Sequence, residues 1–130
     1  MNKIAVDTSA IVACVLSEPG HELLRANLIR SRPLIGQVTW LEAHLVLVGR
    51  MGDTGRLLLD EFASFARPEW VAFTELHLAA ARDAFDRYGK GRHPAALNFG
   101  DCAAYATARV ANLPLLFTGQ DFALTDLPRA

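Results

Sequence analysis

The sequence has no unbroken apolar run of the roughly 20 residues that a membrane-spanning helix requires. Its net charge is only −1 at pH 7, so the overall field gives no indication of a nucleic-acid partner, although a local basic patch is compatible with it. The apolar run 10–16 is unlike the core of a secretory signal, because Asp7 precedes it and Glu18 and Pro19 close it. We therefore expect a cytoplasmic protein without a membrane segment.

Cysteine is scarce as well, with only Cys14 and Cys102 in the chain. They lie far apart and form no C-x-x-C pair, which excludes the common zinc and redox motifs. Each lies within an apolar helical pattern, so we predict two buried free thiols that pack as small hydrophobic side chains. This usage fits a reducing compartment.

The 130 residues are 52% hydrophobic and 21% charged, within the range of globular domains. That length is close to the common size of one domain and allows a sizeable core. No repeat, linker or low-complexity segment divides the chain. We therefore predict a single domain over residues 1–130.

Apolar periodicity predicts strands that alternate with helices. The predicted strands are 4–6, 34–38, 70–73 and 115–118. The predicted helices are 8–17, 21–30, 39–51, 53–65, 75–88 and 100–111. On the fourth helix we expect Leu57, Leu58, Phe62 and Phe65 to face inward, and on the third Leu41, Leu45 and Val48 have helical spacing. This order predicts an α/β fold with a parallel sheet.

Four carboxylates lie where one predicted element ends or the next begins: Asp7, Glu42, Asp101 and Asp121. Each also has a purely structural explanation. Asp7 and Asp121 can cap short helices, Asp101 favours a helix dipole, and Thr39-x-x-Glu42 matches a capping box.

Considered together, the four carboxylates favour a shared site. A parallel sheet with right-handed crossovers brings the carboxyl ends of its strands to one edge. Carboxylates crowded there cannot all stay ionised without a counter-charge, and a divalent cation supplies one. A set of oxygen ligands selects Mg²⁺ or Mn²⁺ over zinc, and one or two such ions can promote phosphodiester hydrolysis.

Several segments carry a family resemblance: Val6-Asp7-Thr8-Ser9-Ala10, Leu41-Glu42-Ala43, the segment His93–Cys102 that contains Asn98-Phe99-Gly100-Asp101-Cys102, and Leu115–Phe122. Together they resemble the PIN domain, specifically the VapC-type toxins of bacterial toxin–antitoxin pairs. The likeness spans essentially the whole chain. Where many relatives carry an acidic residue or asparagine, this chain has Gln120, which leaves Asp121 as the only carboxylate of that segment.

The resemblance implies a three-layer α/β/α fold around a mainly parallel sheet of four or five strands. It also implies a Mg²⁺-dependent endoribonuclease that cuts tRNA or rRNA and leaves 5′-phosphate and 3′-hydroxyl ends. Its catalytic and metal-binding carboxylates would be Asp7, Glu42, Asp101 and Asp121. The resemblance further implies a homodimer that a VapB-type antitoxin neutralises.

Polar residues near these carboxylates are candidates for supporting roles. Thr8, Ser9 and Thr118 can orient carboxylates or a metal-bound water, although capping and strand packing explain them equally well. Asn98 can contact substrate, and an Asx turn is the structural alternative that we favour.

The densest basic stretch precedes Asp101 and contains Arg87, Lys90, Arg92 and His93. These residues can hold RNA phosphates, and a solvated loop explains them equally well. His93 can also serve as a general base, although a structural role is commoner for an isolated histidine before proline. Trp40 and Tyr105 can stack on bases, but we expect both in the core.

Three alternative functions share parts of this pattern. A receiver-like phosphoacceptor also gathers carboxylates at strand ends, but it needs a lysine after a late strand, and neither Lys3 nor Lys90 is so placed. An aspartyl-phosphate phosphatase needs a second aspartate two residues after the first, where Ser9 stands. A non-catalytic interaction module could use the many leucines as an exposed groove.

Overall fold

The computed structural model describes all 130 residues and centres on a four-stranded parallel sheet. The strands are β1 (Lys3–Val6), β2 (Arg32–Gly36), β3 (Glu69–Val71) and β4 (Leu115–Leu116), in the spatial order β3-β2-β1-β4. Because all four strands run in the same direction, their carboxyl ends lie at one edge of the sheet. The predicted α/β class and parallel sheet are confirmed.

Alternate residues of the central strand pack into two different cores. Ile4 and Val6 of β1 belong to one apolar cluster, whereas Ala5 belongs to the other. The same alternation separates Leu116 from Leu115 in β4. Since successive side chains of a strand point to opposite faces, the sheet is buried on both sides.

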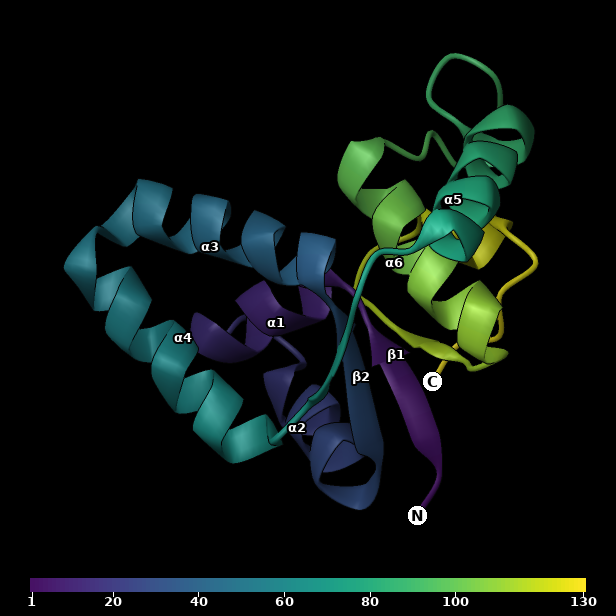
Figure 1. Cartoon of the computed structure of the whole chain (residues 1–130). Helices are drawn as coiled ribbons and strands as arrows, with labels where there is room; N and C mark the ends of the chain where they lie inside the picture. Colours follow the sequence, from purple (N-terminus) through teal and green to yellow (C-terminus); the bar gives the residue numbers. More distant parts are fainter.

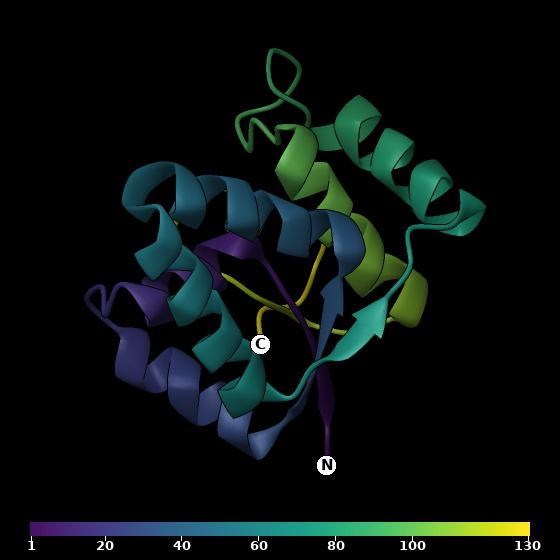
Figure 2. The same cartoon turned by 60° about the vertical axis from the view of Figure 1, so that its left-hand side comes forward.

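Helices cover both faces of the sheet. They are α1 (Thr8–Val15), α2 (His21–Arg30), α3 (Gln37–Met51), α4 (Asp53–Ala66), α5 (Glu75–Tyr88) and α6 (Phe99–Ala111), followed by the 3-10 turn η1 (Phe122–Leu124). The first four helices supply one core, and α5 and α6 supply the other. Figure 1 shows α3 and α4 as an antiparallel pair, with α5 and α6 on the opposite side of the strands. The turned view in Figure 2 shows the same three layers.

Several predicted boundaries differ from the structure. β2 begins at Arg32 because that residue pairs with Lys3, and it ends at Gly36, so Val38 lies in a helix. β4 ends at Leu116, because the backbone N–H of Thr118 donates to the hydroxyl of Ser9 at 3.1 Å. The first helix ends at Val15, two residues early, since Ser17 takes a left-handed conformation with φ of 50°.

The inward faces of two helices also differ from the expectation. On α4 the buried apolar side chains include Leu59, Phe62 and Ala66, whereas Leu57 is 64% exposed. Phe65, which was also predicted to face inward, is exposed. On α3, Ala43 and Leu47 are buried, while Leu41 and Leu45 form an exposed apolar stripe. Each helix is therefore rotated relative to the simplest reading of its leucine spacing.

Other features agree with the sequence analysis. Cys14 and Cys102 are free and buried. Tyr105 is fully buried, and Trp40 packs against the rings of Phe62 and Trp70, so both aromatic residues belong to the packed interior as predicted. None of the helices combines the length and apolar character that crossing a membrane demands.

Candidate functional site

Asp7 follows β1 and caps helix α1. Its backbone is extended, and one carboxylate oxygen, Oδ2, accepts a hydrogen bond from the backbone N–H of Ser9 at 3.0 Å. The other oxygen, Oδ1, is buried and has no hydrogen-bond partner. The residue is only 4% exposed. The helix cap therefore accounts for one oxygen of this carboxylate, whereas the other oxygen has no partner and can bind another ligand.

Glu42 approaches Asp7 from helix α3. Its Oε1 accepts a hydrogen bond from the hydroxyl of Thr8, which also lies 3.4 Å from the carbonyl oxygen of Thr39. The predicted Thr39–Glu42 capping box is wrong, because α3 begins at Gln37 and Glu42 consequently lies in its second turn. That earlier start leaves the carboxylate free to reach α1.

Asp101 is the third residue of α6 and takes part in capping that helix. Its carboxylate accepts from the backbone N–H of Asn98 at 3.0 Å, and Asn98 Oδ1 accepts from the backbone N–H of Asp101 at 3.0 Å. This reciprocal pair is a helix capping box, so Asn98 has a structural role at the start of α6, and its contact with substrate stays a prediction. The second oxygen of Asp101 is not used in the cap.

The side chain of Glu42 on α3 contacts α6 at Gly100. A Cβ atom at this position would collide with the Glu42 carboxylate. The missing side chain therefore lets Glu42 lie directly beside the first turn of α6, next to Asp101. The sequence analysis gave Gly100 no role, although a glycine immediately before a site carboxylate was a usable signal.

The carboxylates influence one another's pKa values. Burial, opposed by the hydrogen bonds from Ser9, raises the pKa of Asp7 to about 6, and the charges of Asp101 and Glu42 add to the rise. Burial also raises the pKa of Asp101, with further contributions from Asp121 and Glu42. Asp7, Glu42 and Asp101 therefore form a mutually repelling group.

Asp121 lies at the margin of this group. It precedes the 3-10 turn η1 but makes no side-chain cap hydrogen bond there. Its charge acts on Asp101 and is not among the causes of the shift at Asp7. The charge of Asp121 therefore raises the pKa of Asp101 but not that of Asp7.

The carboxylates are not arranged as a finished cage, because no group of three or more His, Cys, Asp or Glu side chains is gathered closely enough to hold a metal ion. Each of the three innermost carboxylates has one hydrogen bond within the protein, from Ser9 to Asp7, from Thr8 to Glu42 and from Asn98 to Asp101. The metal-ligand roles of the four carboxylates therefore stay predictions.

The two hydroxyls after Asp7 both act as connectors. Thr8 joins α1 to Glu42, and Ser9 accepts from the Thr118 backbone, which joins α1 to the segment after β4. Thr118 thus contributes its amide to the arrangement. The Thr8 hydroxyl thus orients a carboxylate, whereas the side chain of Ser9 braces the backbone after β4, and the roles of Ser9 and Thr118 towards a metal stay predictions.

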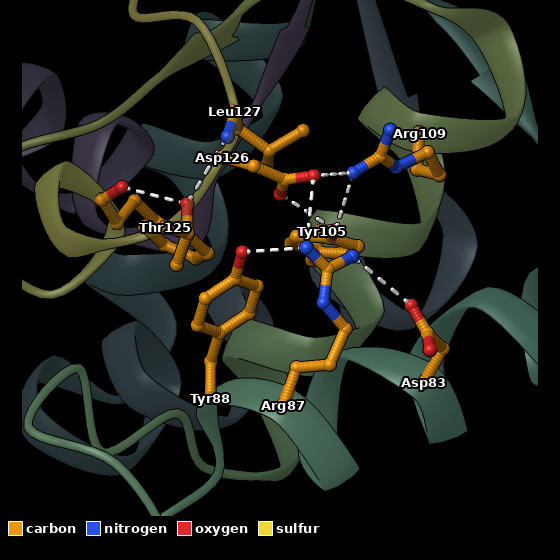
Figure 3. A network of polar contacts seen from close by, with 9 residues as sticks. Asp83, Arg87, Tyr88, Tyr105, Arg109, Thr125, Asp126 and Leu127 are labelled. Carbon is orange, nitrogen blue, oxygen red and sulfur yellow. Dashed lines mark hydrogen bonds and ion pairs between the residues drawn. The ribbon is translucent and has the colours of Figure 1, made fainter.

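The four basic candidates do not share one position. Arg87 is held by Asp83 and Asp126, both at 3.4 Å, in the network of Figure 3. His93 accepts from the backbone N–H of Ala95 at 3.0 Å, so its Nδ1 stabilises its own loop.

The remaining two basic candidates lie near an open groove. Lys90 lines it together with Asn98 and Phe99, and the guanidinium of Arg92 lies 5.2 Å from the ring centroid of Phe85, another lining residue. Their roles as RNA contacts stay predictions.

The fold and these residues match known proteins. The sequence profile of the PIN domain matches residues 4–127, so the chain belongs to the PIN-domain family. Ribonuclease VapC36 of Mycobacterium tuberculosis is 45% identical over 124 residues, covering 94% of this chain and 89% of that protein. Ribonuclease VapC of Mycolicibacterium smegmatis is 42% identical over 126 residues, covering 95% of this chain and 97% of that protein.

Solved structures share the fold at low sequence identity. The VapBC2 structure from Rickettsia felis, bound to a promoter DNA fragment, aligns with a TM-score of 0.77 at 14% identity and covers 98% of this chain and 97% of that chain. Mycobacterium tuberculosis VapC20, a toxin that cleaves the Sarcin-Ricin loop, also gives a TM-score of 0.77, at 15% identity, with 98% of each chain covered. These likenesses confirm the three-layer α/β fold.

Proposed function

We propose that this chain is the toxin of a toxin–antitoxin pair and acts as a Mg²⁺-dependent endoribonuclease on tRNA or rRNA. The observation that carries the proposal is the group of Asp7, Glu42 and Asp101 at the carboxyl edge of the sheet, where burial and mutual repulsion raise two carboxylate pKa values. The relatives at more than 40% identity that are named VapC ribonucleases support the choice of RNA as substrate.

The residues fit a hard divalent cation. Their donors are all carboxylate oxygens, and the unpartnered buried Oδ1 of Asp7 is a ready ligand. Asp7 and Asp101 would hold Mg²⁺, or Mn²⁺ in its place, with Glu42 and Asp121 completing the set. When bound, such an ion supplies Lewis-acid activation of water and neutralises charge at the phosphate.

The protein's own groups position this chemistry. The backbone N–H of Ser9 orients Asp7, and the backbone N–H of Asn98 orients Asp101. Thr8 holds Glu42 towards the same pocket. Fixed carboxylates lose little conformational entropy when a cation and a phosphate arrive, which is how such a site lowers the barrier.

A receiver-like alternative receives no support from the lysines. Lys3 lies at the amino end of β1, opposite the carboxylates, and pairs with Glu69 at 3.6 Å. Lys90 lies in the loop after α5, on the wall of the open groove. Neither position follows a strand at the carboxyl edge, where a phosphoryl group on Asp7 would need a cation.

The proposal includes a VapB-type antitoxin and a homodimer as partners. The Rickettsia felis neighbour is described as a VapBC2 complex. Exposed apolar side chains of this chain provide surfaces that association would bury, among them Leu41, Leu45, Leu57 and Phe65. Cytoplasmic location follows in the proposal from the RNA substrate.

The direct test is RNA cleavage by the purified protein with Mg²⁺ and with a chelator in its place. We expect cleavage only with the metal, products with 5′-phosphate and 3′-hydroxyl ends, and no cleavage by Asp7→Asn, whose circular dichroism should match that of the parent. Asp83→Asn is the matched control, because Asp83 is an exposed carboxylate far from the group. An Asp7→Asn variant that still cleaves with metal would refute the proposal, and RNA binding without cleavage would favour an interaction module.

A further inference from the structure

An open groove lies beside the carboxylate group. Its volume is about 720 Å³, within the range of ligand sites, and helices α3, α5 and α6 together with the loop after α5 form its walls. Val38 lines the groove from α3, and Glu42 lies one helical turn further along the same face. Asn98 and Phe99 line it from α6, directly before Asp101. The groove and the carboxylates are therefore neighbouring parts of one surface.

Phe99 is the most conspicuous side chain of this groove. It is 82% exposed, although it is a phenylalanine in the first turn of a helix whose next turns are buried. A solitary exposed leucine needs no explanation, but a nearly free aromatic ring beside a group of carboxylates offers a flat surface to a ligand. Phe73 and Phe85 add partly exposed rings from α5 and the segment before it.

The charged residues of the groove indicate an anionic occupant. Arg82 and Lys90 line it, and Arg92 lies over the ring of Phe85 on the same wall. Asp86 is the acidic lining residue. Two cations and one carboxylate therefore line the groove, and Arg92 adds a third cation beside it. This small local excess of positive charge contrasts with the neighbouring group of carboxylates.

Aromatic rings interleaved with cations are how proteins hold unpaired nucleotides, because bases stack on the rings and phosphates meet the cations. We propose that this groove holds a nucleotide of single-stranded RNA next to the scissile phosphodiester, with its base stacked on Phe99 and its phosphates near Lys90 and Arg92. The inference rests on the proposed ribonuclease function and deepens it. A flipped or looped nucleotide is therefore the expected substrate form.

The test measures binding separately from cleavage, in an Asp7→Asn background. The probe is a labelled 12-nucleotide single-stranded RNA of mixed sequence. Phe99→Ala should bind it roughly 5- to 100-fold more weakly, since loss of one base–aromatic stack has that effect. Phe99→Trp should restore binding. Leu23→Ala is the matched control, because it truncates an exposed apolar side chain on α2, away from the groove, and it should bind as the background does.

Stacking itself has a spectroscopic signature. The added indole of Phe99→Trp should lose fluorescence when RNA binds, after subtraction of the signal from Trp40 and Trp70. The same strand with abasic riboses should cause no quenching, and Leu23→Trp should show none with either strand. Quenching by the abasic strand would show that the phosphates, not a stacked base, change the fluorescence, and it would overturn the proposed stacking at position 99.

The remaining outcomes separate this inference from the proposed function. Unchanged binding by Phe99→Ala, or no binding of the probe by the background protein, would overturn the groove assignment. So would a sedimentation experiment in which Phe99→Ala turns a dimer into a monomer, because the groove would then be an interface between copies. If the parent protein cuts RNA with Mg²⁺ while Phe99→Ala binds normally, only this inference fails. If RNA binds through Phe99 but is never cut, only the proposed function fails.

Discussion

The hydroxyl of Thr8 donates a hydrogen bond to the carboxylate of Glu42, joining the first turn of α1 to the second turn of α3. The two residues are 34 positions apart in the chain. The contact exists because parallel strands β1 and β2 bring the starts of both helices to the same edge of the sheet. Thr8 therefore positions Glu42 relative to Asp7, its immediate neighbour in sequence.

Replacing that hydroxyl should weaken catalysis without altering the carboxylates. We predict that Thr8→Val, which keeps the shape of the side chain, lowers Mg²⁺ affinity or cleavage rate roughly 10- to 100-fold, as losses of ligand-orienting hydrogen bonds do. The measurement is a Mg²⁺ titration of RNA cleavage. Thr125→Val removes a hydroxyl that bonds only locally and should leave the titration unchanged. An identical Mg²⁺ dependence for Thr8→Val and the parent would contradict the positioning role.

A methyl group at position 100 should disturb the same carboxylate from the other side. In Gly100→Ala the new Cβ would occupy the space of the Glu42 carboxylate, so Glu42 or the first turn of α6 must move. We expect loss of most cleavage activity and little change in the free energy of unfolding, because the atoms that must move are the far end of the flexible Glu42 side chain. Thermal unfolding and cleavage rates measure both effects.

Gly49→Ala supplies the control for this substitution. Gly49 lies within α3, and a Cβ there meets nothing within 4 Å. Alanine should therefore stabilise the helix by about 0.5 to 1 kcal/mol and leave cleavage intact. Equal behaviour of the two glycine variants would show that Glu42 tolerates the added atom.

Sequence periodicity predicted the order of elements but not the positions where tertiary contacts end them. The six helices were found because each carries an amphipathic repeat and a clear breaker. The end of β4 was missed because the side chain of Ser9, more than 100 residues away, takes the N–H of Thr118 out of the strand. No local pattern contains that information.

The same distinction holds for the candidate site. The rule that strand ends share one edge placed Asp7 near Asp101, and in the structure the charge of Asp101 contributes to the raised pKa of Asp7. The roles of Gly100 and Phe99 depend on how closely α3 approaches α6 and on which ring stays uncovered. The inward face of α4 was ambiguous in the sequence because Leu57, Leu58 and Leu59 are consecutive. Tertiary packing buries Leu59 and leaves Leu57 exposed.

The raised pKa of Asp7 predicts how the stability of the metal-free protein depends on pH. Burial raises that pKa to about 6 from an ordinary 3.8, so between these values the folded state binds more protons than the unfolded state. The free energy of unfolding should therefore fall as pH rises from about 4 to 6, by up to about 3 kcal/mol, and then level off. The raised pKa of Asp101 acts in the same direction.

Asp7→Asn isolates the contribution of Asp7. In urea unfolding at pH 4.5 and 7.5 with a chelator, the variant should lose much less stability than the parent, and at pH 7.5 it should be the more stable of the two. Adding Mg²⁺ should reduce the difference in free energy of unfolding between parent and variant at pH 7.5, because the ion stabilises the parent. If the free energy of unfolding depends on pH in the same way in parent and variant, burial does not raise the pKa of Asp7.

Asp126 provides a second, independent electrostatic test at the other end of α6. Its carboxylate accepts from the hydroxyl of Tyr105 at 2.8 Å, from the guanidinium of Arg109, and from Arg87 at 3.4 Å, which fastens the C-terminal segment to α5 and α6 (Figure 3). Burial alone would raise the pKa of Asp126, but these hydrogen bonds and charges outweigh it and hold the pKa below its usual range. The stabilisation is therefore present above the ordinary pKa of aspartate and lost as pH falls through the lowered value.

We predict that Asp126→Asn lowers the free energy of unfolding at pH 7 by about 1 to 2 kcal/mol, since it removes a charge that serves several donors. Asp83→Asn, at an exposed carboxylate that pairs with Arg87 one helical turn away, should cost less than about 0.5 kcal/mol. The difference between the two variants should shrink as pH falls through the lowered pKa of Asp126, because the parent then loses that charge. RNA cleavage should survive both substitutions, because neither residue approaches Asp7, Glu42 or Asp101 closely enough to act on their charges. Equal losses of stability in the two variants at pH 7 would mean that the C-terminal segment is held by its apolar contacts alone.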